Sequence, residues 1–236
     1  MLKFFHSFVS SFLNFLYPPI CPGCNREFEE SENFLCFTCY QKLFTSSLAV
    51  CPKCGRPVPY FTKCQECQPK LGLLRIRALG LYREPFKGTL EEFKYKGKIK
   101  LGEILGDALS LLLAYDPILK DTNLLVPIPL HCARYRERGY NQSEILAQQV
   151  GKRTKIPLAP CLLRKRNTKS QVELSPEKRF ENVKDAFTFK SGYEIKEKKI
   201  TIVDDVTTTG ATLSAAAKVL KENGAKEVYG LVVAKG

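Results

Sequence analysis

The pattern of apolar and polar residues predicts strands that alternate with helices along most of the chain. Runs rich in β-branched and aliphatic residues, typical of buried strands, occupy 76–82, 124–130, 199–203 and 227–234. Apolar residues spaced three and four apart predict helices over 2–16, over 89–114 with a break at 95–98, and over 213–223. This alternation favours an α/β fold, with a parallel sheet and flanking helices.

The stretch from Ile200 to Leu213 carries the densest candidate chemistry. Its apolar strand leads into two adjacent acids, Asp204 and Asp205, and then into a hydroxyl-rich turn before the next helix. Backbone N–H groups, hydroxyls and the positive end of a helix dipole converge at such a turn and favour an anion. We therefore predict a phosphate cradle formed by Thr207, Thr208, Thr209, Gly210, Ala211 and Thr212.

Two common phosphate-binding motifs do not fit this stretch. It lacks the Gly-x-x-x-x-Gly-Lys-Ser/Thr of a P-loop and the Gly-x-Gly-x-x-Gly of a dinucleotide-binding fold. The alternative is an ordinary strand-to-helix turn with a threonine cap. Paired acids followed by Thr-Thr-Thr-Gly-Ala-Thr are hard to explain by capping alone. The acids lie too early to touch the phosphate, so we expect them to meet sugar hydroxyls or a metal ion.

A second anion site is predicted after the strand at 124–130. The segment that follows is crowded with guanidinium groups at Arg134, Arg136 and Arg138, and we interpret it as a basic loop leading into a helix. Arginine is suited to a bidentate grip on phosphate oxygens. Lys94 begins a row of alternate lysines that ends at Lys100, which is either a solvated edge or a further phosphate contact.

Residues 164–175 are basic, polar and without clear periodicity, and we predict that they form a mobile flap. Such loops commonly close over reactive ligands and exclude water. A disordered basic linker is the alternative. The candidate ligand contacts in and after the flap are Arg164, Arg166, Gln171 and Arg179.

Eight of the ten cysteines form four Cys-x-x-Cys pairs before residue 68. Each pair can direct two thiolates at one metal ion, and two pairs complete a tetrahedral zinc site. The simplest scheme is two sequential zinc ribbons, although a crossed scheme fits the spacing as well. Both sites are predicted to be structural, because no coordination position remains open. The predicted ligands are Cys21, Cys24, Cys36 and Cys39, then Cys51, Cys54, Cys64 and Cys67.

We predict two domains, a zinc-ribbon module with an apolar helix over 1–70 and an α/β domain over 71–236. The helix at 2–16 is too short to span a bilayer, and no small-residue cleavage site follows it. We expect it to pack on its own protein, with a contact to a membrane surface or a partner as the alternative. Zinc thiolates fit a reducing compartment, so we expect a cytoplasmic protein that is not transmembrane.

The charge is strongly uneven along the chain. The net charge is +13, and residues 71–236 carry 30 of the 37 basic and 19 of the 24 acidic residues. The positive excess therefore belongs to the part with the phosphate cradle. It suits a polyanionic ligand, either a pyrophosphorylated sugar or nucleic acid, and a solvated basic surface would look the same.

Taken together, these motifs resemble one family. The zinc knuckles come first, and the acids with their threonine turn are similar to the phosphoribosyl pyrophosphate (PRPP) motif of type I phosphoribosyltransferases. The whole order is similar to the ComF family (ComFC/GntX-like), a double zinc ribbon fused to such a transferase domain. The motifs between knuckles and acids are Val126-Pro-Ile-Pro129, Arg138-Gly-Tyr-Asn-Gln142, Gln171 to Arg179, Asn182-Val183 and Ala186-Phe187.

This resemblance implies a Rossmann-like parallel sheet and a PRPP-binding transferase. Residues 207–212 would hold the 5-phosphate, and the two acids would accept hydrogen bonds from the ribose hydroxyls, directly or through Mg²⁺. The three arginines and Lys94, with Mg²⁺, would neutralise the pyrophosphate. The resemblance also suggests a link to natural transformation, the uptake and handling of single-stranded DNA. No residue identifies the acceptor.

The rival prediction is a protein without turnover. Its cradle would bind a nucleotide or the 5′-phosphate of single-stranded DNA, and its zinc module and basic surface would dock nucleic acid or DNA-uptake proteins. Residues 94–100 and 164–169 would carry that surface. A steep loss of affinity with salt would mark DNA binding, whereas release of pyrophosphate from PRPP would mark an enzyme.

Overall fold

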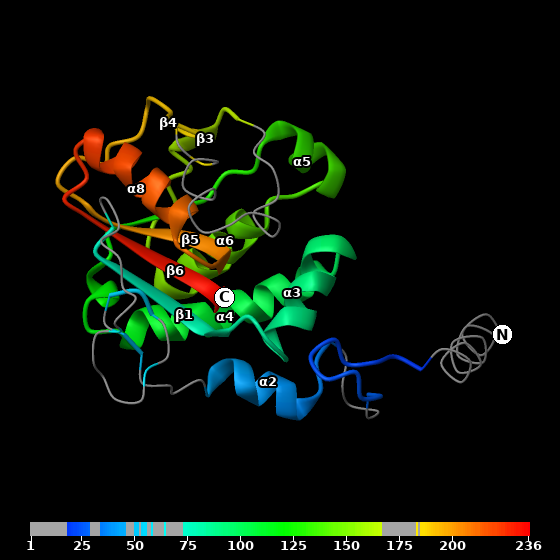
Figure 1. Cartoon of the computed structure of the whole chain (residues 1–236). Coiled ribbons are helices and arrows are strands. Elements are labelled where there is room, and N and C mark those ends of the chain that lie inside the picture. The colour runs from blue at the N-terminus through cyan, green and yellow to red at the C-terminus, as the bar shows by residue number, and fades with distance from the viewer. Residues whose placement is uncertain are drawn as a thin grey trace.

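The computed structural model of the chain describes residues 18–28, 34–45, 50–51, 53–55, 58, 64, 73–166, 183 and 185–236. The helix predicted at 2–16 and the flap beyond residue 166 lie outside this part of the chain. Figure 1 shows a central sheet with helices on both of its faces. Within the described residues, none of the helices combines the length and the apolar character needed to cross a bilayer.

Four parallel strands form the central sheet. Their order in space is β1 (Arg75–Leu81), β6 (Glu227–Lys235), β5 (Lys199–Thr207) and β2 (Leu124–Pro127). β5 and β6 lie in the centre and are buried along most of their length, as expected for strands that are covered on both faces. The predicted α/β class is confirmed. β2 ends earlier than predicted, since Pro129 has no N–H to extend the ladder.

Helices from two stretches of the sequence cover the two faces. One face packs against α3 (Phe86–Tyr95), α4 (Ile99–Tyr115) and α6 (Gln142–Thr154), and the other packs against α8 (Ala211–Glu222). The predicted break is confirmed at Gly97, whose φ of 67° no helix interior accepts. The remaining elements are α2 (Phe37–Phe44), η1 (Leu119–Asp121), α5 (Cys132–Arg138) and the antiparallel pair β3 (Leu162–Arg164) and β4 (Phe187–Phe189).

The cysteine-rich segment packs directly on the α/β part. Cys21, Cys36 and Cys39 are buried in the same apolar cluster as the helices α3 and α4. The Lys53 carbonyl accepts a hydrogen bond of 2.9 Å from the Ile76 N–H, on the outer edge of β1. An edge strand exposes unpaired backbone groups, so this contact protects part of β1 from pairing with another chain. The domain boundary at residue 70 stays a prediction.

Candidate functional site

The predicted phosphate cradle lies at the carboxyl end of the central strand β5. The strand ends at Thr207, and α8 begins at Ala211 directly after Gly210, which has a φ of 81°. The hydroxyl of Thr209 accepts a hydrogen bond from the Ala211 N–H, at 3.3 Å. Gly210 turns the chain so that the first N–H groups of a twelve-residue helix face the end of the sheet. Such a turn can bind a phosphate.

Replacing Gly210 should test how strongly the turn depends on its left-handed backbone. We expect Gly210→Ala to lower the free energy of unfolding by about 1–2 kcal/mol, because a Cβ is disfavoured at this φ. Gly210→Asn should cost less, since asparagine tolerates the left-handed region. Thermal unfolding of both variants measures the difference. Equal stability of the two variants and the parent protein would contradict a conformational requirement for glycine.

The C-terminal end of β6 supports the turn at 207–212 through two hydrogen bonds. The Lys235 ammonium donates a hydrogen bond to the Thr208 carbonyl, and the Gly236 N–H donates to the Thr207 carbonyl at 2.9 Å. Lys235 is buried, so its positive charge lies under the turn where an anion would bind. The sequence analysis missed this residue. Its only sequence signal is a lysine at the end of the last apolar strand.

The two predicted acids lie side by side next to the cradle and differ in their surroundings. Asp204 is buried, and its Oδ1 accepts hydrogen bonds from the Ser143 hydroxyl at 2.8 Å and from the Asp205 N–H at 2.9 Å. Asp205 Oδ2 pairs with the Lys94 ammonium at 2.8 Å. A serine at this position is suited to cap the helix α6 (Gln142–Thr154), and the sequence analysis did not single out Ser143 as a site residue. Asn141 takes that role, and Ser143 is left to bond to Asp204.

Burial raises the pKa of Asp204 to about 7. The neighbouring Asp205 carboxylate acts in the same direction, while the Ser143 and Asp205 hydrogen bonds and Lys94 oppose it. The pKa of Lys94 is raised because the Asp205 and Asp204 carboxylates outweigh the effect of burial. A carboxyl group that titrates near neutral pH beside a phosphate turn is typical of a functional site.

Three of the four lysines in the row form ion pairs with glutamates that are close to them in the sequence. Lys96 and Lys98 both pair with Glu92, at 2.6 Å and 2.7 Å, and Lys100 pairs with Glu103 at 2.8 Å. Lys94 faces the opposite way, toward the acids of β5. The predicted row therefore divides into one lysine at the candidate site and three lysines at a solvated edge.

The three predicted arginines lie on a helix, and the prediction of a basic loop was wrong. The His131 Nδ1 caps α5 by accepting the Ala133 N–H, and Gly139 ends the helix with a φ of 79°. Neither cap stands out in the sequence, since the seven residues between them are mostly charged. α5 follows β2 at the same edge of the sheet as the acids (Figure 1).

Arg138 connects α5 to the helix that carries Lys94. Its Nη1 donates to Gln142 Oε1 at 3.1 Å, and its guanidinium lies 5.1 Å from the centre of the Tyr95 ring. Arg134 is half-buried and Arg136 is exposed. The three arginines of α5 thus differ in exposure, and Arg138 is already oriented by its contacts with Gln142 and Tyr95.

Two of the four predicted flap contacts lie within the described residues. Arg164 ends β3, and its guanidinium lies 5.5 Å from the centre of the Phe187 ring. Burial lowers the pKa of Arg164, the Asp204 carboxylate opposes this change, and Arg134 reinforces it. Arg164, at the start of the predicted flap, is thus within electrostatic reach of both Asp204 and Arg134 of α5. Arg166 is exposed, and Gln171 and Arg179 lie outside the described residues.

The cysteines form two separate clusters in the sequential order. The thiols of Cys21, Cys24, Cys36 and Cys39 gather in one cluster, and those of Cys51, Cys54 and Cys64 gather in the other, each within 4.8 Å. This grouping excludes a crossed scheme for these seven residues, and Cys67 lies outside the described residues.

The geometry of both clusters fits zinc. Zinc–sulfur bonds of about 2.3 Å in a tetrahedron place sulfur atoms about 3.8 Å apart. The Sγ atoms of Cys24 and Cys36 are 3.6 Å apart, and those of Cys54 and Cys64 are 3.5 Å apart. The Cys39 N–H donates to the Cys36 sulfur, which would stabilise a thiolate there. The four sulfur ligands of the first cluster leave no coordination position open, so zinc bound there is structural.

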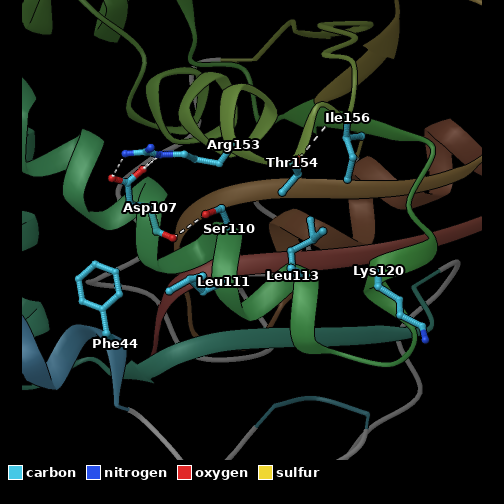
Figure 2. Close-up of a pocket in the computed structure, with 10 residues that line it drawn as sticks. Phe44, Asp107, Ser110, Leu111, Leu113, Lys120, Arg153, Thr154 and Ile156 are labelled. Atoms are coloured by element: carbon cyan, nitrogen blue, oxygen red, sulfur yellow. Dashed lines mark hydrogen bonds and ion pairs between the residues drawn. The ribbon is translucent and has the colours of Figure 1, made fainter.

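A cavity of about 610 Å³ lies apart from these sites, between α4 and the end of α6. Figure 2 shows the Asp107–Arg153 ion pair at one end of it and Lys120 at the other. Leu111, Leu113 and Ile156 supply apolar surface. None of the predicted ligand residues lines this cavity, so it does not belong to the candidate phosphate site.

Comparison with known proteins agrees with this arrangement. Residues 12–68 match the model of a double zinc ribbon domain, and residues 137–236 match that of a phosphoribosyl transferase domain. The chain is 31% identical over 217 residues to Competence protein F of Haemophilus influenzae, covering 88% of this chain and 93% of that protein. It is 29% identical over 225 residues to Competence protein ComFC of Bacillus subtilis, covering 87% and 90%.

A third relative has a different name. DNA utilization protein YhgH of Escherichia coli K12 is 27% identical over 219 residues, covering 89% of this chain and 94% of that protein. Each of the three similarities covers 87% or more of this chain. The chain therefore belongs to the ComF family, in which a double zinc ribbon precedes a phosphoribosyltransferase-type domain.

Proposed function

We propose that this protein binds PRPP at the carboxyl end of β5 and acts as a phosphoribosyltransferase. The turn at 207–212 holds the 5-phosphate through its N–H groups and hydroxyls. Asp204 and Asp205 accept hydrogen bonds from the ribose hydroxyls. Arg134, Arg136 and Arg138 on α5, together with Lys94, neutralise the pyrophosphate.

The reaction breaks the bond between C1 of the ribose and pyrophosphate and forms a bond to an acceptor. Positive charge develops on the sugar as pyrophosphate leaves, and carboxylates fixed in advance stabilise it. Ser143 and Lys94 hold the two carboxylates in place. The guanidinium groups of α5 balance the negative charge that gathers on the leaving group. The pKa of Arg164 responds to the Asp204 carboxylate, so its guanidinium lies near enough to the acids to contact a ligand bound there.

The carboxylates also suit Mg²⁺, which prefers oxygen ligands and enters such sites with a phosphorylated substrate. Asp205 already pairs with a cation, the Lys94 ammonium, which supports a cation requirement at that atom. Mg²⁺ bound here would supply positive charge to the pyrophosphate.

The observation that carries the proposal is the buried acid pair beside the glycine turn. We expect the double variant Asp204→Asn, Asp205→Asn to lose PRPP binding. A neutral amide accepts weaker hydrogen bonds from the ribose hydroxyls than a carboxylate does, and it binds Mg²⁺ less well. Titration calorimetry with Mg²⁺ and PRPP measures this. Asp121→Asn is the matched control, since that carboxylate is exposed and lies before β2. Unchanged affinity in the double variant would refute the assignment.

The acceptor requires a separate experiment. A screen for pyrophosphate release, with PRPP and a panel of nucleobases and small amines, would identify it. Binding of PRPP without release for any acceptor would favour a protein that senses PRPP without turnover.

A second candidate function is suggested by the relatives. Two of them are named competence proteins and one a DNA utilization protein. We therefore propose a role in DNA uptake, in which the cradle or the basic surface meets single-stranded DNA or DNA-uptake proteins. Affinity for an oligonucleotide that falls steeply with salt would support it. The structural zinc thiolates favour a cytoplasmic location, which fractionation of cells would test.

A further inference from the structure

The first turn of α3 is in tight contact with the first zinc knuckle, which is the Cys-x-x-Cys turn at residues 21–24. The Pro22 carbonyl lies so close to Gly88 that a Cβ on that glycine would come within 1.9 Å of its oxygen. On the knuckle side, a Cβ on Gly23 would come within 2.8 Å of the Pro85 Cβ. The knuckle and the helix can therefore approach this closely only because both positions are glycine.

The contact continues into the core. The knuckle cysteines belong to the apolar cluster that buries Phe86, Leu90 and Phe93 of α3. An interior packed in this way has few voids, so a displacement of one side chain is transmitted to the side chains around it. The knuckle and the apolar face of α3 thus form one packed unit.

The other end of α3 reaches the candidate site. Lys94 pairs with Asp205 at 2.8 Å, and the Phe93 carbonyl accepts a hydrogen bond from the Tyr140 hydroxyl. Tyr95 lies under the guanidinium of Arg138. Ten helical residues span only about 15 Å, so a shift of the first turn displaces the last.

We propose that the first zinc cluster positions Lys94 through α3 and so sets the affinity of the site for its anion. Pro22, Gly23 and Gly88 are positioning residues in this scheme, because they touch neither the acids nor the cradle. The inference rests on the proposed function, since it takes PRPP as the ligand that Lys94 meets. It connects a metal site that has no catalytic ligand position with a binding site at the far end of one helix.

Gly88→Ala tests the connection. The added methyl group must push the knuckle away from α3, while alanine favours the helix itself. We expect the variant to retain its zinc, measured by elemental analysis, and to bind PRPP with Mg²⁺ about tenfold more weakly. Lys87→Ala is the control, because Lys87 is an exposed neighbour on the same helix, and its affinity should equal that of the parent.

Hydrogen exchange without ligand gives a readout that does not depend on PRPP. We expect faster exchange of the amides at 94–96 and 205–207 in Gly88→Ala. Gly23→Ala introduces the same clash from the knuckle side, but its Cβ would also come within 2.9 Å of the Cys39 Sγ. It therefore replaces Gly88→Ala, if that variant does not fold, on condition that its zinc content equals that of the parent. Faster exchange in Gly88→Ala, together with a parent protein that binds no PRPP, would support the coupling and refute the proposed function. Unchanged exchange and affinity in a zinc-loaded variant would overturn the coupling.

Discussion

Removing zinc with a chelator is expected to destabilise the whole chain and not only the cysteine-rich segment. Structural zinc contributes on the order of 10 kcal/mol to folding in small zinc peptides. The first cluster shares its apolar core with α3 and α4, and the second meets the edge strand β1 through Lys53. Arg77, buried and paired with Asp116, also donates to the carbonyl of Cys51. Loss of either cluster therefore exposes part of the sheet.

Calorimetric unfolding of the native and chelated protein measures this effect. We expect the melting temperature of the main transition to fall by roughly 10–20 °C, which corresponds to about 5 kcal/mol for a chain of this size. Cys36→Ser should reproduce much of the loss, because it removes one thiolate of the first cluster. Cys132→Ser is the matched control, since that thiol is exposed and belongs to neither cluster. A chelated protein whose main transition does not move would show that the sheet folds independently of the zinc.

The variant Asp204→Asn is expected to be more stable than the parent protein above pH 7. Burial raises the pKa of Asp204 to about 7, so the folded state binds its proton more tightly than the unfolded state does. The stability from this group is fully present below the unfolded pKa near 4 and is lost as pH rises to about 7. Asparagine does not titrate and can keep the hydrogen bond from Ser143.

The size of this effect follows from the pKa difference. Each pKa unit corresponds to about 1.4 kcal/mol, so the variant should gain up to about 4 kcal/mol on the parent between pH 4 and pH 8. Denaturant unfolding across this range measures it. Asp205→Asn provides the contrast, because it leaves the largely buried Lys94 without its ion pair and should destabilise the protein at pH 8. A constant difference between Asp204→Asn and the parent across the range would contradict a raised pKa.

An acid that destabilises the fold at neutral pH indicates that function, and not stability, retains it. The ligand would supply what the folded protein lacks, namely hydrogen-bond donors and positive charge near Asp204. Binding of PRPP with Mg²⁺ should therefore weaken the dependence of stability on pH.

Local patterns were sufficient for the elements and for the metal ligands. The apolar runs identified β5 and β6 because strands covered on both faces need continuous apolar side chains, and alternation along 76–82 identified β1. The break between α3 and α4 was visible because Gly97 interrupts the helical spacing. The Cys-x-x-Cys pairs identified the zinc ligands, since that spacing directs two thiolates at one ion.

Features that depend on long-range contacts were not predictable in the same way. The caps of α5 are a histidine and a glycine that are common in loops, so the segment was interpreted as a loop. The brace of Lys235 under Thr208 joins residues 27 positions apart in sequence. The sequential zinc scheme could not be chosen from spacing alone, because the spacing does not exclude a crossed pairing.

The sequence by itself determined the α/β class, the glycine turn between β5 and α8, the acidic pair and the cysteine ligands. Each of these depends on residues that are close together in the chain. Only the tertiary structure decided which groups surround the acids, and it divided the lysine row between Asp205 and a solvated edge. It also brought the first zinc knuckle onto the helix that carries Lys94. These arrangements arise when a parallel sheet gathers the ends of distant strands at one edge, and no local pattern records which residues then meet.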